Sequence, residues 1–175
     1  MQKRLACPKL NIRRVGDTTS VGGIAAPYLT PITYAGRREQ IARGAFEKTL
    51  ANKSNVRVYS DHSYTVASMI GSTDTGSVTL TDTPDGLEFS VELPNTQRAS
   101  EVAELAGKGL LGASIGFNKF DYELDEKRIV TYKQIDLEEI SIVAEPAYPT
   151  TVTTRSQATH IDHVLNYYEF SKKLI

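Results

Sequence analysis

The sequence predicts one domain of mostly β structure, in the α+β class, with two helices inserted among the strands and a third helix appended at the carboxyl end. Two observations support this. Short apolar segments bounded by Gly, Pro, Asn and Asp recur from residue 21 to residue 143, as in β proteins. Helical spacing of apolar residues is confined to three short stretches. A chain of 175 residues is long enough to bury one core.

Composition excludes several classes of protein. Hydrophobic residues make up 40% of the chain and charged residues 23%, and no apolar stretch approaches the roughly 20 residues of a membrane span. Net charge is −1 and the basic residues are scattered, so we expect neither a membrane nor a nucleic acid as partner. The first eight residues lack the apolar core of a secretory signal. Cys7 is the single cysteine, which excludes an internal disulfide and fits a reducing cytoplasm.

The first third of the chain mixes strands with one short helix. Residues 21–34 combine Gly, Pro and small apolar residues without a helical period, which favours strands and turns. Phe46 and Leu50 are four residues apart and predict a short helix within 39–50, with Gly44 near its start. A strand is expected from Asn55 to about Ser60.

A hairpin and a helix follow. Asp85-Gly86 separates the apolar segments 78–80 and 87–93, a strong hairpin signal. Asn95 or Thr96 can cap the next helix, and glycines end it. The apolar positions of that helix follow the i, i+3, i+4, i+7 pattern: Ala99, Val102, Ala103 and Ala106.

The last predicted strands form a second hairpin, with segments 113–122 and 129–143 joined by the charged turn 124–128. Residues 150–157 are polar and resemble a linker, and apolar residues from Ile161 to Tyr168 predict an amphipathic terminal helix. We therefore divide the chain into a β domain, 1–150, and a linker with a carboxyl-terminal helix, 151–175.

Ser114 is a candidate nucleophile. Side chains alternate along a strand, so Ala113, Ile115 and Phe117 share one face while Ser114 and Gly116 share the other. Ser114 then faces away from the apolar packing, and Gly116 removes bulk beside its hydroxyl. An ordinary small residue in a tight packing layer would give the same pattern.

His62 is the candidate base, because a serine hydroxyl needs an imidazole to take its proton at neutral pH. Alternation along the preceding strand places His62 on the side of Val56, Val58 and Ser60, at the end of a partly buried row. It is the only histidine of the β domain. A structural histidine in the core would look the same.

A histidine base needs a third group to orient it, and Glu138 and Glu139 are the candidates. Both interrupt an apolar strand, where removing an unpaired carboxylate from water costs roughly several kcal/mol. Neighbouring strand positions point to opposite faces, so only one of them can serve His62. Charged residues on an exposed strand edge remain the alternative. His160 and His163, three apart in the terminal helix, could suggest a metal site, but no third ligand is nearby and we expect no metal and no cofactor.

Taken together, several segments resemble the prohead maturation proteases of tailed bacteriophages over about residues 20–150. The segments are Ala42 to Phe46, the strand ending in Asp61-His62, Asp85 to Leu87, Leu93 to Gln97, Gly112 to Phe117 and Leu137 to Ala147. That family is related in fold to the herpesvirus assemblins, which implies a herpesvirus-protease-like β barrel surrounded by helices.

The resemblance implies a serine endopeptidase without cofactor, with Ser114 as nucleophile, His62 as base and Glu139 as third member. Implied substrates are the scaffold portion of the major capsid protein and the protease itself. The implied location is the host cytoplasm, inside the assembling procapsid. The sequence does not decide whether the chain forms a homo-oligomer. Two alternatives remain: a noncatalytic scaffolding protein on the same framework, and a metal-dependent hydrolase using the terminal histidines.

The chain departs from the family pattern in two places. Asp61 precedes and Ser63 follows the histidine, where the family commonly has Asn and Asp, and Ala113 stands where Met is frequent. Neither change removes a catalytic atom.

Overall fold

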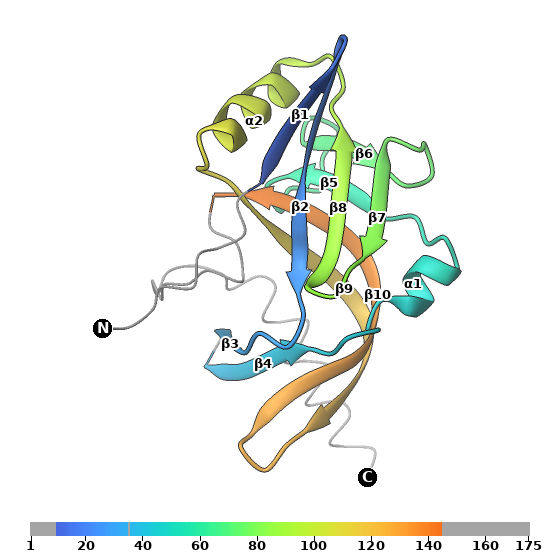
Figure 1. Ribbon diagram of the computed structural model, residues 1–175, viewed down its shortest axis with the longest axis vertical. Helices are drawn as coiled ribbons and strands as arrows, with labels where there is room; N and C mark the ends of the chain where they lie inside the picture. Colours follow the sequence, from blue (N-terminus) through green and yellow to red (C-terminus); the bar gives the residue numbers. More distant parts are fainter. Residues whose placement is uncertain (1–9, 35, 145–175) are drawn as a thin grey trace.

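A computed structural model describes residues 10–34 and 36–144. Its strands form two sheets that face each other (Figure 1). The four-stranded sheet has the order β1-β2-β8-β7, and its strands run as β1 Asn11–Val15, β2 Thr18–Pro27, β7 Val78–Asp82 and β8 Gly86–Glu92. All its pairs are antiparallel. The hairpin predicted around Asp85-Gly86 is confirmed as β7 and β8.

The second sheet has the order β3-β4-β10-β5-β6, with β9 paired to β10 along its other side. Its strands are β3 Ile32–Tyr34, β4 Arg37–Ile41, β5 Arg57–Ser60, β6 Met69–Ser72, β9 Gly112–Leu124 and β10 Ile129–Val143. The long β9–β10 hairpin is the one expected from the charged turn at 124–128. The other side of β10 is shared, in parallel, by β4 near its start and β5 near its end.

The interval between β4 and β5 along β10 is filled by α1, Glu47–Ala51, and the turn before it. Ala42 donates to the Tyr132 carbonyl at 2.9 Å, and Ile135 donates to the Ala45 carbonyl at 2.7 Å. The Thr49 hydroxyl donates to the Ile135 carbonyl at 2.9 Å and accepts from the Leu137 amide at 3.1 Å. Backbone groups of β10 that lack a strand partner on this side are thereby satisfied.

The helix expected over 39–50 is wrong in its first part. Residues up to Ile41 form β4, and Gly44, with a φ of +78°, belongs to the turn before α1. Pairing of β4 with β10 has overridden the local helical pattern, as tertiary contacts do in short segments. The second helix, α2 Gln97–Gly107, is confirmed: the Thr96 hydroxyl accepts from the Ala99 amide at 3.2 Å.

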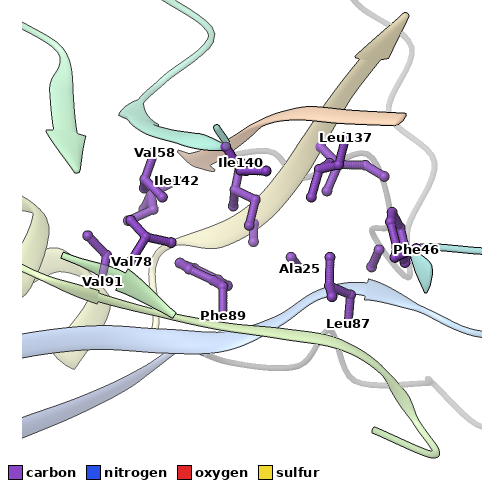
Figure 2. Packing of buried hydrophobic residues seen from close by; sticks show 14 of the residues in the cluster. Ala25, Phe46, Val58, Val78, Leu87, Phe89, Val91, Leu137, Ile140 and Ile142 are labelled. Carbon is purple, nitrogen blue, oxygen red and sulfur yellow. The ribbon is translucent and has the colours of Figure 1, made fainter. Parts of the chain in front are cut away.

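The hydrophobic core lies between the two sheets (Figure 2). Leu87, Phe89 and Val91 of β8 extend toward side chains of β5 and β10, which include Val58, Ile140 and Ile142. Phe46, just before α1, closes the core at one end. The residues of this cluster are nearly all buried, so the layer between the sheets supplies most of the hydrophobic stabilisation of the fold.

The expected closed β barrel is not formed by the described strands. The two sheets are joined at one corner, where Tyr28 makes a single parallel bridge to Ile41, and no other pair of strands within 10–34 and 36–144 links them. Side chains rather than ladder hydrogen bonds hold the rest of the layers together, so the architecture is α+β and mostly β, with two facing sheets. The predicted carboxyl-terminal helix and the boundary at residue 150 lie outside the described residues.

Candidate active site

Two strands bring a serine and a glutamate to the same face of the second sheet. Ser114 of β9 lies directly opposite Ser141 of β10, and Gly116 lies opposite Glu139. Residues opposite each other in an antiparallel pair point to the same side, with Cα atoms roughly 4.5–5.5 Å apart. Ala113 and Ile115 point the other way, into the core, as the alternation predicted. Ser114 is only 3% exposed.

Glu139 owes its position to an irregularity in β10. The register with β9 shifts on both sides of Leu137, and the residues that enter the core change parity there: Leu137 and Ile140, three residues apart, are both in the core cluster. Strict alternation would have placed Leu137 and Glu139 on one face. The irregularity turns Glu139 to the face opposite the core, beside Ser141.

Glu138 takes no part in this cluster. Its side chain is exposed, and its Oε1 accepts a hydrogen bond from Asn118 Nδ2 at 2.6 Å. Glu139 is 2% exposed. Of the two carboxylates that the sequence left open, the structure therefore buries one and leaves the other at the surface.

His62 reaches Glu139 by a sharp change of direction after β5. Asp61 has a φ of +66°, in the left-handed region that Asp tolerates better than most residues, and its amide donates to the Ile142 carbonyl at 2.8 Å. This turn ends the alternation of β5. The prediction that His62 shares the side of Val56 and Val58 is therefore wrong, because His62 lies with Glu139 on the opposite face.

His62 and Glu139 are in direct contact. Nδ1 of the imidazole lies 2.8 Å from Oε1 of the carboxylate, and the His62 side chain is 37% exposed. The hydrogen bond to Glu139 is the main cause that raises the pKa of His62 above 6.5; burial opposes it, and the charges of Glu139 and Asp61 add to it. A carboxylate only accepts, so Nδ1 carries the hydrogen and Nε2 is the basic nitrogen.

Two further donors hold the carboxylate. The Ser141 hydroxyl donates to Oε2 at 3.0 Å, and the Tyr64 hydroxyl donates to Oε1 at 3.1 Å. Ser141 is fully buried, and its Oγ also lies 3.2 Å from the Asp61 carbonyl, which ties β10 to the turn that carries His62. These hydrogen bonds compensate the burial of the carboxylate.

A compact loop after His62 carries Tyr64. Ser68 is buried and its hydroxyl bonds within the loop: it donates to the Ser63 carbonyl and accepts from the Thr65 amide at 3.2 Å. The Ser60 amide then donates to the Ser68 carbonyl at 2.7 Å, which returns the chain to β6. The Tyr64 ring meets Tyr59 of β5 edge to face, with centroids 5.4 Å apart.

The structure thus unites His62 and Glu139 in a hydrogen bond. Ser114 is placed near them by strand pairing alone: it lies opposite Ser141, whose hydroxyl donates to Glu139. Sequence reasoning missed the parts played by Ser141 and Tyr64. Ser141 could have been found, because it is two residues after Glu139 on the same strand and shares its face. Tyr64 carries no such signal, since the loop conformation alone brings it to Glu139.

No group of three or more His, Cys, Asp or Glu residues within 10–34 and 36–144 is arranged to hold a metal ion. His160 and His163 lie outside that part of the chain. Over the same residues, no helix is long and apolar enough to span a bilayer.

A buried carboxylate on Nδ1 of a histidine, on the sheet face that also carries a serine, has the composition of a Ser–His–acid hydrolase site. Comparison with protein families makes the class specific. The chain belongs to the Caudovirus prohead serine protease family, whose model matches residues 9–166. No curated protein and no solved structure matches the chain.

The family resemblance drawn from the sequence motifs is therefore confirmed. Membership implies a serine protease of capsid maturation, acting in the procapsid within the host cell. The kinship in fold with herpesvirus assemblins stays a prediction.

Proposed function

We propose that the chain is a serine endopeptidase that cleaves the scaffold portion of the major capsid protein, and itself, during prohead maturation. Ser114 is the nucleophile, His62 the general base and Glu139 the group that orients His62. The observation that carries this proposal is the 2.8 Å contact between His62 Nδ1 and the buried Glu139 carboxylate, on the sheet face that also bears Ser114.

The proposed reaction is acyl transfer. Nε2 of His62 takes the Ser114 proton while Oγ attacks the scissile carbonyl carbon, and Glu139 stabilises the imidazolium that forms. His62 then gives this proton to the leaving amine, and an ester joins Ser114 to the acyl half of the substrate. Water attacks the ester, its proton goes to His62, and Ser114 recovers its hydrogen when the acid product leaves.

Two features support these roles. Nδ1 is engaged by Glu139, so the ring is held in one orientation and one tautomer, as a base must be. The hydrogen bond to Glu139 raises the pKa of His62 above 6.5, which strengthens the imidazole as a base.

The test is the intact mass of the purified protein, and of a co-expressed capsid protein, followed over time for the wild type, Ser114→Ala and Ser90→Ala. Ser90 is an exposed serine of β8 and serves as the matched control. We expect both proteins to be shortened by the wild type and by Ser90→Ala, and to stay intact with Ser114→Ala. Processing by Ser114→Ala would contradict the proposal.

Melting curves of the same variants test the noncatalytic alternative. If Ser114 and His62 serve only to pack the sheet, substituting them changes the melting temperature. The wild-type protein would then show no cleavage of itself or of the capsid protein. The endopeptidase proposal expects Ser114→Ala to melt close to the wild type, because only one oxygen atom is removed. A chelator is expected to have no effect, in contrast to a metal-dependent hydrolase.

A further inference from the structure

The carboxylate of Glu139 is shared unequally between its donors. Oε1 accepts from His62 Nδ1 at 2.8 Å and from the Tyr64 hydroxyl at 3.1 Å, whereas Oε2 accepts from Ser141 at 3.0 Å. His62 and Tyr64 therefore compete for the same oxygen. Ser141 holds the other oxygen and fixes the plane of the carboxylate.

Tyr64 is not placed there by core packing. It is 62% exposed, yet its hydroxyl is directed to a carboxylate that is 2% exposed. Its ring rests on Tyr59, and the hydroxyl of Ser68 organises the loop that bears it. Because its ring is exposed and its hydroxyl contacts a buried carboxylate, Tyr64 contributes more through its hydrogen bond to Glu139 than through hydrophobic burial.

Because two donors share Oε1 of Glu139, the carboxylate stabilises the charged form of the His62 imidazole less strongly. A hydrogen bond to an ionised oxygen disperses part of its charge, so a second donor weakens the pull on the first. Glu139 and Asp61 both raise the pKa of His62. A base whose pKa is raised too far stays protonated at working pH and cannot take a proton from serine.

We propose that Tyr64 is a positioning residue that moderates the pull of Glu139 on His62 by donating to the same carboxylate oxygen. The proposal rests on the function proposed above, because it assigns Tyr64 to the tuning of the general base. The titratable groups whose charge or hydrogen bonding acts on His62 or Tyr64 are Asp61 beside His62, Glu139 and the more distant Glu138 on β10, and Tyr59 on β5. The pKa of Tyr64 itself is raised by burial first and then by Glu139, so the hydroxyl remains a donor throughout the working range of pH.

Tyr64→Phe removes the hydroxyl and keeps the ring on Tyr59. The readout is the NMR titration of the His62 imidazole, measured in a Ser114→Ala background so that no self-cleavage occurs, with the signal identified by its loss in His62→Gln. We expect Tyr64→Phe to raise the pKa of His62 by about 0.5–1 unit, since the remaining donor then takes the full charge of Oε1. In the catalytically competent chain, the acid limb of the kcat/KM profile moves to higher pH by the same amount.

Tyr28→Phe is the matched control, because its hydroxyl also donates to a carboxylate, that of Asp82 at 2.6 Å, at another place in the fold. It should leave the His62 titration unchanged. An unchanged or lowered His62 pKa in Tyr64→Phe overturns the role of Tyr64, whatever the activity. A raised pKa in a chain that cleaves nothing leaves the coupling in place and overturns the proposed function instead.

Discussion

Gly116 lies opposite Glu139 across the β9–β10 pair, and the absent side chain of Gly116 leaves the space that the Glu139 side chain occupies. A Cβ at residue 116 would stand 2.6 Å from Glu139 Cγ and 2.7 Å from Oε1. Non-bonded carbon atoms do not approach so closely, so the carboxylate can lie over the strand only because residue 116 is glycine. Gly116 thus permits the position of Glu139, the residue proposed to orient the base.

Gly116→Ala should therefore move the carboxylate away from His62. We expect a loss of about 1–3 kcal/mol in the free energy of unfolding from overpacking, together with a large fall in proteolysis. Urea denaturation and the rate of capsid-protein processing measure the two effects.

Gly107→Ala is the control for this substitution. Gly107 is the last residue of α2, and a Cβ there meets only Ile12 Cγ1, at 3.7 Å, an ordinary contact. Alanine at this position should keep or slightly increase stability and leave processing intact. Equal activity of Gly116→Ala and Gly107→Ala would show that the position of Glu139 does not depend on Gly116.

Glu139→Gln should abolish most of the activity while Glu138→Gln should not. The amide keeps the size of Glu139 but not its charge, so it neither stabilises the imidazolium nor fixes the tautomer that leaves Nε2 basic. Loss of the orienting carboxylate in other Ser–His–acid enzymes costs roughly 10⁴-fold in kcat. Glu138 is exposed and bonded to Asn118, so its variant is expected to process substrate within about threefold of the wild-type rate. Similar rates for the two variants would remove Glu139 from the proposed site.

The pKa of His62 gives the stability a defined dependence on pH. Glu139 raises this pKa above 6.5, so the folded state favours the charged imidazole. The resulting stabilisation is complete below the unfolded-state pKa and disappears as pH rises through the raised folded-state value. His62→Gln should therefore lose most stability, relative to the wild type, near pH 5.5 and least near pH 9. Urea denaturation at both pH values checks this; a difference that grows toward pH 9 would contradict it.

Thr49→Val should destabilise the fold by about 1–3 kcal/mol, because the valine leaves a carbonyl and an amide of β10 buried without a partner. Those groups are the Ile135 carbonyl and the Leu137 amide. Thr49→Ser keeps the hydroxyl and should retain most of the stability. Thermal or urea unfolding of both variants separates the hydrogen bonds from the packing: a larger loss in Thr49→Ser than in Thr49→Val would mean that the methyl group matters and the hydroxyl does not.

Much of the fold could be predicted because it depends on local signals. Asp85-Gly86 specified the β7–β8 hairpin, Thr96 the start of α2 and the charged turn at 124–128 the β9–β10 hairpin. The segment around Arg37–Ile41 was misassigned because its strand forms only through pairing with β10, some ninety residues later in the chain. Closure into a barrel likewise depends on edge pairing between sheets, which alternation of residues does not encode.

In the candidate site, too, some features could be predicted from local sequence patterns and others could not. The face of Ser114 followed from simple alternation, and its position opposite Ser141 agrees with that. The side of His62 did not follow, because one residue with positive φ, Asp61, ended the alternation. The choice between Glu138 and Glu139 came from family resemblance and not from the residues alone, since the irregularity at Asp136–Glu139 changes the parity of β10. Tyr64 was beyond prediction because its contact depends on the path of a loop.

The parallel pairing of β5 with β10 has a consequence for the timing of activity. Residues 57–60 pair with residues 139–142, so His62 cannot meet Glu139 until nearly 80 further residues have been synthesised. Domains fold as units while a ribosome adds roughly 5–20 residues per second, and contacts so distant in sequence form late. Glu139 follows Ser114 by 25 residues, so a nascent chain holds Ser114 and His62 for roughly 1–5 seconds without the carboxylate proposed to orient the base. On the roles proposed here, the growing polypeptide is inert toward its neighbours on the polysome, and proteolytic competence arises only once β10 has left the ribosome.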